Sequence, residues 1–152
     1  KNKQLLLDTN IFIDADSKPT VFTQFFNKLK NNGVTLITID FVVIEFLKGA
    51  IHENIYIEKK EFVGQLVQEY LTVDKKIINN LHKLIKMYKQ DGRAASITDL
   101  LLGAFLMEYK NDLFLMTKNT TDFPANIFRL VSILNLPLTK SIQTYGIYSF
   151  NT

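Results

Sequence analysis

The segment Gln4-Leu5-Leu6-Leu7-Asp8-Thr9-Asn10 decides the fold of this chain. Its three consecutive leucines predict a short buried strand over residues 4–8, with an acid at the carboxyl end of that strand. A carboxylate in this place is costly unless it is hydrogen-bonded, paired with a charge or bound to a metal. Asp8 is therefore a candidate functional residue, and capping of the next turn through Thr9 and Asn10 is the structural alternative.

The remaining sequence alternates between helical and extended patterns. Strands are predicted at 34–39, 113–116 and 127–133, with an edge strand at 142–150. Helices are predicted at 21–29, 41–49, 55–71, 74–88 and 96–109, and the third and fourth of these are expected to form an amphipathic pair. Pro19 is expected to open the first helix and Gly49 to cap the second.

This order of elements predicts an α/β fold, a three-layer sandwich with a mostly parallel central sheet and helices on both faces. In such sheets the ligand crevice lies beyond the carboxyl ends of the strands. Asp8 and the segment after Met116 both stand at such an end. We expect residues 1–152 to form one domain, because no linker, repeat or low-complexity tract interrupts them.

The composition excludes several kinds of site. The chain has no cysteine, which rules out disulfides, thiolate zinc sites and cysteine nucleophiles and fits a reducing cytoplasm. No apolar run is long enough for a signal peptide or a membrane span, so we expect a cytoplasmic protein without membrane contact. The net charge of +3 permits a nucleic-acid partner, although the lysines are scattered along the sequence.

Glu45 is a second candidate, because it is the only charge in the apolar segment 41–47. It shares a helix face with Phe41 and Ile44. Since that face is apolar, we expect the carboxylate to point inward toward the crevice. A solvated position on the outer face of the helix is the alternative.

Two further acids stand at the boundaries of predicted elements. Asp99 belongs to Ser96-Ile97-Thr98-Asp99, a capping-box-like pattern at the start of an apolar helix. Asp122 lies in a polar turn after the strand 113–116, where turn chemistry alone explains an acid. Capping and turn formation therefore stay open beside a functional role. Asp14 is of interest as well, because it lies close in sequence to Asp8.

Four blocks of this sequence together resemble the PIN domain. They are Leu5-Leu6-Leu7-Asp8-Thr9-Asn10, Ile44-Glu45-Phe46, Ser96-Ile97-Thr98-Asp99 and Thr117-Lys118-Asn119-Thr120-Thr121-Asp122-Phe123. Their order and separation match along almost the whole chain. The last block resembles the T-x-N-x-x-D-F signature of VapC-type toxins, the ribonucleases of toxin–antitoxin pairs.

The resemblance implies a divalent-metal-dependent endoribonuclease that hydrolyses RNA phosphodiester bonds with one or two Mg²⁺ or Mn²⁺ ions. Hard cations of this kind select oxygen ligands. By resemblance the acids that hold the metal and carry catalysis are Asp8, Glu45 and Asp99, with Asn119, Asp122 or both in the fourth place. The side chains that line the site are Thr9, Asn10 and Thr117.

The substrate and the partners follow from the same resemblance. Lys48, Arg93 and Lys118 lie near the acids in sequence and are candidates to hold the RNA backbone, with ordinary surface charge as the alternative. Tyr56 or Tyr88 could stack on bases, with core packing as the alternative. The resemblance also implies a small antitoxin partner and a homodimer. The candidates for the dimer face are Phe62, Leu66, Tyr70, Ile77 and Leu81, with a larger core within the chain as the alternative.

Other functions compete with the toxin ribonuclease. A PIN nuclease of RNA maturation or decay would carry the same acids. An inactive PIN-like binding module is a third possibility, against which the complete set of acids argues. An aspartyl phosphatase would usually have a second acid two residues after Asp8, where this chain has Asn10.

Overall fold

The computed structural model describes residues 3–152. The strands are β1 (Lys3–Leu7), β2 (Val34–Ile39), β3 (Glu69–Leu71), β4 (Leu113–Thr117), β5 (Phe128–Leu138) and β6 (Ser141–Phe150). The helices are α1 (Thr9–Ser17), α2 (Pro19–Asn31), α3 (Asp40–Leu47), α4 (Glu53–Leu66), α5 (Lys75–Gln90) and α6 (Ile97–Tyr109). Two short 3₁₀ turns, η1 (Lys110–Asp112) and η2 (Thr120–Asp122), flank β4.

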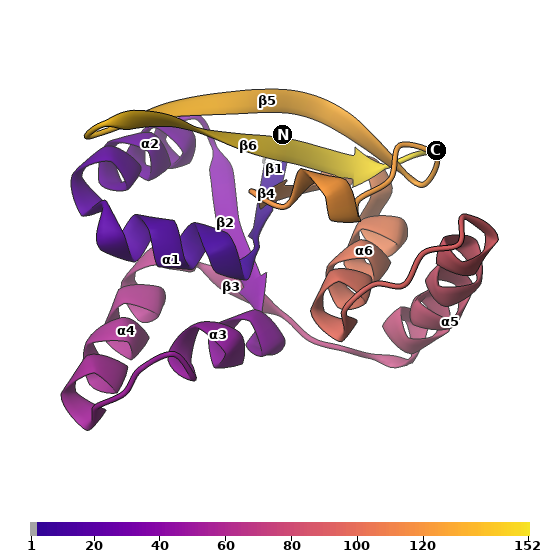
Figure 1. Ribbon diagram of the computed structural model, residues 1–152, viewed down its shortest axis with the longest axis horizontal. Coiled ribbons are helices and arrows are strands. Elements are labelled where there is room, and N and C mark those ends of the chain that lie inside the picture. Colours follow the sequence, from indigo (N-terminus) through magenta and orange to yellow (C-terminus); the bar gives the residue numbers. More distant parts are fainter. Residues whose placement is uncertain (1–2) are drawn as a thin grey trace.

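The six strands form one sheet in the order β3-β2-β1-β4-β6-β5. The first four are parallel to one another, whereas β6 pairs antiparallel with both β4 and β5. Helices pack on the sheet from both sides, with α1 and α2 on one side and α6 on the other (Figure 1). The expected α/β fold with a mostly parallel, helix-covered sheet is therefore confirmed.

The strand order reverses beside β1. The chain proceeds outward from β1 to β2 and β3, and then returns to the other side of β1 to form β4. Right-handed crossovers on the two sides of such a point place their helices on opposite faces of the sheet. The crevice in which sheets of this type bind ligands lies at such a point, here beyond the carboxyl ends of β1 and β4.

The triple leucine follows from the central place of β1. Leu6 and Leu7 are 0% exposed, because β1 has a parallel neighbour on each edge and helices on each face. The same reasoning explains α6, whose residues from Thr98 to Leu106 are all buried between β4 and α5. The sequence predicted both elements because burial on all sides leaves an uninterrupted apolar run.

Helix α1 was absent from the elements predicted, because only a capped turn was expected after Asp8. The helix extends over 9 residues and buries Ile11, Phe12 and Ala15. The polar residues Thr9, Asn10 and Asp14 interrupt its apolar pattern, so the sequence did not indicate a helix. Pro19 stands at the start of α2, as predicted.

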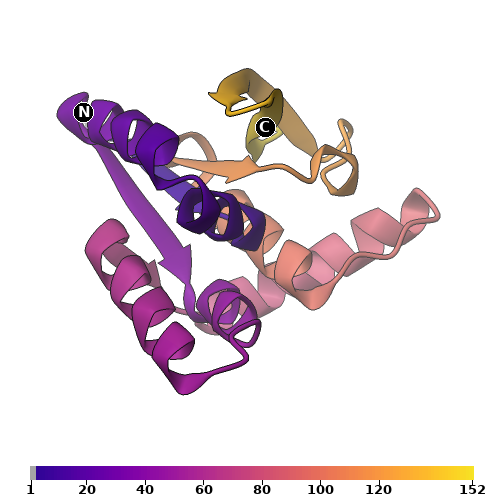
Figure 2. The same cartoon turned by 60° about the vertical axis from the view of Figure 1, so that its left-hand side comes forward.

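Both helices predicted at 55–71 and 74–88 are present, but the first is shorter than predicted and the two do not pack as a pair. α4 ends at Leu66, and residues 69–71 form β3 beside β2 rather than the last turn of a helix. Val67 leaves the helix in an extended conformation, and the Gln68 side chain then accepts a hydrogen bond from Leu36 N at 2.9 Å. As a result α4 packs on α3 and α1, whereas α5 packs on α6 at the other end of the molecule (Figure 2).

The proposed dimer face fails for the same reason. Leu66, Ile77 and Leu81 are buried within the chain at 8%, 1% and 9% exposure and are not available to a second copy. Phe62 is half-buried, and Tyr70 is the exposed member of the set.

Smaller corrections concern the ends of elements. Residues 142–150 are not an edge strand, because β6 lies between β4 and β5, and β5 is the edge and extends to Leu138. Lys48 takes the C-cap position of α3 that was expected for Gly49. Among residues 3–152, no helix combines the length and the apolar character that crossing a membrane requires.

Two glycines provide a test of this packing. A Cβ at Gly103 in α6 would lie 2.8 Å from Phe128 Cζ and 3.1 Å from Leu84 Cδ1, whereas a Cβ at Gly64 in α4 would meet nothing within 4 Å. We expect Gly103→Ala to destabilise the protein by about 1–3 kcal/mol through overpacking. Gly64→Ala should stabilise it by up to about 1 kcal/mol through helix propensity. Urea denaturation measures both, and equal stability of the two variants would contradict the described contact of α6 with β5.

Candidate active site

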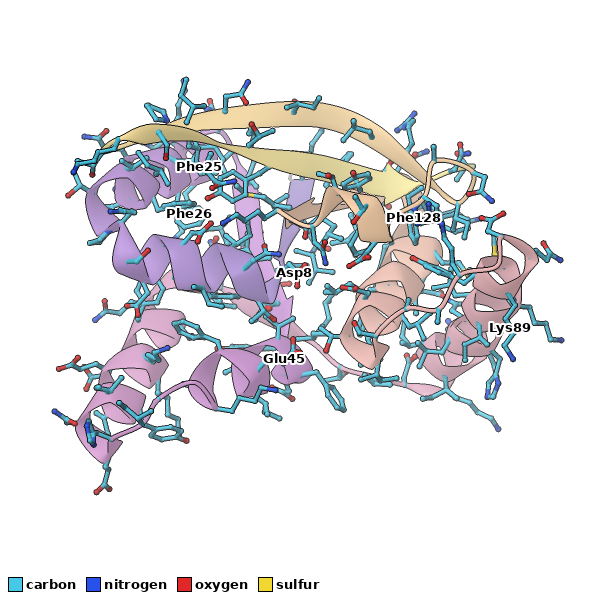
Figure 3. All side chains as sticks on the ribbon, viewed as in Figure 1. Asp8, Phe25, Phe26, Glu45, Lys89 and Phe128 are labelled. Carbon is cyan, nitrogen blue, oxygen red and sulfur yellow. The ribbon has the colours of Figure 1, made fainter. Side chains whose placement is uncertain are left out.

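Asp8 stands at the carboxyl end of β1 and is the N-cap residue of α1. Its Oδ1 accepts a hydrogen bond from Thr9 N at 2.7 Å and its Oδ2 accepts one from Thr117 Oγ1 at 2.7 Å. Capping and participation in the site are therefore not alternatives, because one oxygen does each. The side chain lies between α1 and α6 (Figure 3).

Thr117, the last residue of β4, joins the two strands that flank the crevice. Its hydroxyl donates to Asp8 and accepts from Asn119 N at 3.0 Å and from Asn10 Nδ2 at 3.4 Å. Asn10 Oδ1 in turn accepts from Lys118 N at 3.1 Å. Asn10 and Thr117, two of the three side chains predicted to line the site, thus form one hydrogen-bonded group with Asp8, and this group fixes the start of α1 to the end of β4.

Glu45 reaches the same crevice from α3. Thr9 Oγ1 donates to Glu45 Oε1 at 2.7 Å, so Asp8 and Glu45 are bound to the backbone and the side chain of one threonine. The reason given for its inward direction was wrong, however. Phe41 and Ile44 are 45% and 58% exposed, and the buried face of α3 carries Val42 and Phe46. Glu45 lies at the border of that face and is half-buried.

Asp99 enters from the first turn of α6. Its backbone N–H donates to Ser96 Oγ at 3.1 Å, which confirms the predicted cap. The carboxyl group is buried and shares a hydrogen bond with the side chain of Asp122. The cap therefore directs the helix start, and the acid with it, toward the end of the sheet.

Asp122 is held through its backbone by an unusual set of contacts on η2. The three successive carbonyl oxygens of this turn accept hydrogen bonds from side chains of β6, of the loop before α6 and of α5: Thr120 O from Tyr148 OH at 3.2 Å, Thr121 O from Arg93 Nη1 at 2.8 Å, and Asp122 O from Tyr88 OH at 2.8 Å. Asn119 Nδ2 donates to the Asp122 carboxylate itself. These contacts fix the position of Asp122, which an ordinary turn residue would not require.

The charges of these acids act on one another. Burial above all raises the pKa of Asp8 above its ordinary 3.8, and the charges of Glu45 and Asp122 raise it further. Burial, followed by the charges of Asp8 and Asp122, raises the pKa of Asp99 to about 7. Like charges that disfavour each other's ionisation must lie close together, so the structure brings the four predicted acids to one end of the sheet.

This set of donors suits a hard divalent cation. It offers carboxylate, amide and hydroxyl oxygens, the ligands of Mg²⁺ and Mn²⁺. Within residues 3–152, no three His, Cys, Asp or Glu side chains are grouped closely enough to bind one ion directly. Mg²⁺ commonly takes one or two carboxylates and keeps several waters, so the arrangement fits such an ion through Asp8 and Asp99, with Glu45, Asn119 and Asp122 around them.

The three cations predicted for substrate binding differ in their surroundings. Lys118 Nζ lies 3.3 Å from Asp14 Oδ2, which also accepts a hydrogen bond from Tyr145 OH at 2.7 Å. Arg93 is engaged with Thr121 O. Lys48 is exposed one turn after Glu45. Two of the three therefore have contacts that position the loops of the site.

The tyrosines of the site were not foreseen in these roles. Tyr88 is 3% exposed and cannot stack on a base, so of its two predicted roles the core position holds. Its burial and the charges of Asp99 and Asp122 raise the pKa of its hydroxyl. Tyr145 and Tyr148 lie in β6, whose place next to β4 the sequence did not indicate. No local pattern could have identified these contacts, because each joins segments far apart in the chain.

Two solved structures share this fold. A chain of VapBC-1 from nontypeable Haemophilus influenzae is similar with a TM-score of 0.64 and 22% identity, over 79% of this chain and 90% of that one. A chain of VapBC2 from Rickettsia felis, solved bound to a DNA fragment from their promoter, is similar with a TM-score of 0.59 and 20% identity. The match covers 66% of this chain and 78% of that one. This likeness shows that the chain shares the α/β fold of these two chains. The sequence matches no family model and no curated protein.

The raised pKa of Asp99 predicts a pH-dependent stability in the presence of a chelator. The folded protein retains a proton up to about pH 7 that the unfolded chain releases near 3.8. The protonated Asp99 therefore contributes its full share to the free energy of unfolding below pH 3.8, and this share is lost as the pH rises through about 7. We expect the urea midpoint to fall over this window and Asp99→Asn to flatten the fall, whereas Asp16→Asn on the exposed side of α1 should keep it. A midpoint that rises with pH, or an unchanged slope in Asp99→Asn, would contradict the clustering of acids.

The hydroxyl of Tyr88 should be needed for the order of η2. Tyr88→Phe leaves the ring packing intact but removes the donor to Asp122 O, which should cost about 1–2 kcal/mol. Amide hydrogen exchange should also become faster around η2. Tyr109→Phe, at a ring that is 41% exposed, is the matched control. Exchange at η2 that is unaffected by Tyr88→Phe would show that the other contacts suffice.

Proposed function

We propose that this protein is a divalent-metal-dependent endoribonuclease of the PIN type and the toxin of a toxin–antitoxin pair. The observation that carries the proposal is the convergence of Asp8, Glu45, Asp99 and Asp122 on the crevice where the strand order reverses. Burying acids together destabilises the empty protein. A fold that keeps such a cluster gains from a bound cation.

The residues divide the work according to their contacts. Asp8 has both oxygens fixed by Thr9 and Thr117, which makes it a rigid ligand rather than a mobile base. Asp99 is buried and close to Asp122, so the pair can hold an ion and its waters from the opposite side of the crevice. Glu45 is half-buried, so that a water can reach its carboxylate and give up a proton to it.

Mg²⁺ or Mn²⁺ bound by these residues would supply a lowered pKa for water and stabilise negative charge on the phosphate. Hydrolysis forms a bond from the water oxygen to phosphorus and breaks the bond to the 3′-oxygen. The products are a 5′-phosphate and a 3′-hydroxyl. No protein nucleophile is needed for this reaction, in agreement with a chain that has no cysteine.

The partner is proposed from the structural neighbours. Both similar chains come from VapBC complexes, which supports a small antitoxin as the partner of this chain. A cationic side chain of the antitoxin would neutralise the acid cluster and inhibit the enzyme without unfolding it. A homodimer and a cytoplasmic location stay predictions. A gene for a small DNA-binding protein beside this one would favour the toxin over a PIN nuclease of RNA maturation or decay.

Metal-dependent cleavage of RNA tests the catalytic proposal. The purified protein should cleave a mixed RNA pool with Mg²⁺ or Mn²⁺ and not with a chelator. Asp8→Asn should abolish cleavage and should also be at least as stable as the parent without metal, because one repelling charge is removed. Mg²⁺ should raise the melting temperature of the parent and not that of Asp8→Asn.

Asp16→Asn is the matched control for this experiment, because Asp16 is an exposed acid on the same helix α1 and lies outside the crevice contacts. It should cleave like the parent. Cleavage that survives a chelator, or equal cleavage by Asp8→Asn and the parent in preparations free of host nucleases, would refute the proposal.

A further inference from the structure

Helix α5 concentrates the positive charge of the molecule. Its 16 residues include Lys75, Lys76, Lys83, Lys86 and Lys89 and no acid. The whole chain has 18 Lys and Arg against 15 Asp and Glu, so the rest of the chain has 13 against 15 and is net negative. The net charge of +3 is thus the sum of the charges of a cationic helix and a mildly acidic remainder of the chain.

All five lysines lie on the outer side of this helix. The residues that α5 buries against α6 are Ile77, Asn80, Leu81, Leu84 and Tyr88. At about 100° per residue, which follows from 3.6 residues per turn, the five lysines fall in an arc centred opposite that buried stripe. They are all exposed. Figure 3 shows Lys89 at the outer edge of the molecule, directed away from α6.

The helix is held rigidly in this orientation. Asn80 Nδ2, buried in the contact between the helices, donates to Ala104 O at 3.2 Å and to Glu108 Oε1 at 3.1 Å. Among residues 3–152, neither of the acids that flank the helix is hydrogen-bonded to one of these lysines: Asp74 Oδ1 accepts from Ile77 N at 3.0 Å as the helix cap, and Asp91 Oδ2 accepts from Asn126 Nδ2 at 2.6 Å. The lysine face is therefore a fixed cationic surface.

The carboxyl end of this surface meets the acid cluster. Tyr88, in the last turn of α5, donates to Asp122 O, and Arg93, shortly after the helix, donates to Thr121 O. A helix of 16 residues is about 24 Å long at 1.5 Å per residue. A polynucleotide with one phosphodiester at the acids can consequently extend along several of these lysines.

We propose that the outer face of α5 binds the sugar–phosphate backbone of the RNA substrate beyond the point of cleavage. The inference rests on the proposed ribonuclease function and assigns a place to its substrate. Lysines contact phosphates as point charges without reading bases. The surface therefore adds affinity without sequence preference, and it attracts RNA toward a site whose own acids repel it.

Binding to Asp8→Asn, which should not cleave, tests this surface apart from catalysis. The probe is a short fluorescent single-stranded RNA of mixed sequence, and its affinity is measured by anisotropy over a series of salt concentrations. The α5 variant combines Lys83→Gln, Lys86→Gln and Lys89→Gln, since glutamine has nearly the helix propensity of lysine. The control variant combines Lys28→Gln, Lys60→Gln and Lys140→Gln, three exposed lysines on other elements.

The α5 variant should bind RNA several-fold more weakly, and the slope of log K against log salt should become shallower by about 2, because each phosphate contact of a single strand contributes about 0.7. The control variant should keep the slope of the parent. Equal effects in the two variants would show a diffuse charge effect and overturn the proposal, as would no change in either.

An acidic protein segment is the competing occupant of this face. Polyglutamate is the test of this alternative. If it displaces the RNA from the parent at equal charge concentration, and its affinity falls in the α5 variant to the same degree, the face binds acidic protein segments and the RNA assignment is refuted. Failure of the nuclease proposal would appear differently. Binding would then still depend on α5, whereas the parent would cleave no RNA with any metal.

Discussion

The hydrogen bond from Thr117 Oγ1 to Asp8 Oδ2, 2.7 Å long, crosses the point at which the strand order reverses. It joins the ends of β1 and β4, and through Asn10 and Thr9 it also fixes the first turn of α1 and the carboxylate of Glu45. A buried carboxylate without such donors would cost several kcal/mol. The crevice therefore exists in its present form because the polar groups that line it satisfy one another.

The same constraint explains why η2 is held so firmly. Asp122 would move away from Asp8 and Asp99 if repulsion alone decided its place. Its backbone is retained by donors from α5, from β6 and from the loop before α6, namely Tyr88, Tyr148 and Arg93. The free energy of these hydrogen bonds offsets the electrostatic repulsion between the carboxylates. Two of these donors, Tyr88 and Tyr148, are buried residues of separately packed elements, so the position of Asp122 depends on the packing of α5 and of β6.

Local features of the sequence were sufficient to predict part of the fold and of the candidate site. Leu5-Leu6-Leu7 predicted β1, and Ser96 predicted the start of α6, because burial on all sides and helix capping leave a signal within a few residues. β3 was missed because the helix pattern continues through Tyr70, and only the pairing of Gln68 with Leu36 ends the helix. Glu45 was expected at the crevice because the apolar Phe41 and Ile44 indicated a buried face of α3, whereas both side chains are exposed. Long-range contacts have no such local signal.

The distribution of charge shows most clearly what folding adds. The lysines of α5 are scattered in the sequence, but a helical turn brings them to one face, whereas the acids come from four segments and meet only through the sheet. Exposed charges act over about 8 Å at physiological salt. Because α6 stands between α5 and the sheet (Figure 1), most of the lysine face is separated from the acids and does not neutralise them. The acid cluster can therefore keep its affinity for a cation while a polyanion is attracted to the same molecule, and the two surfaces meet only at the end of α5, beside Asp122.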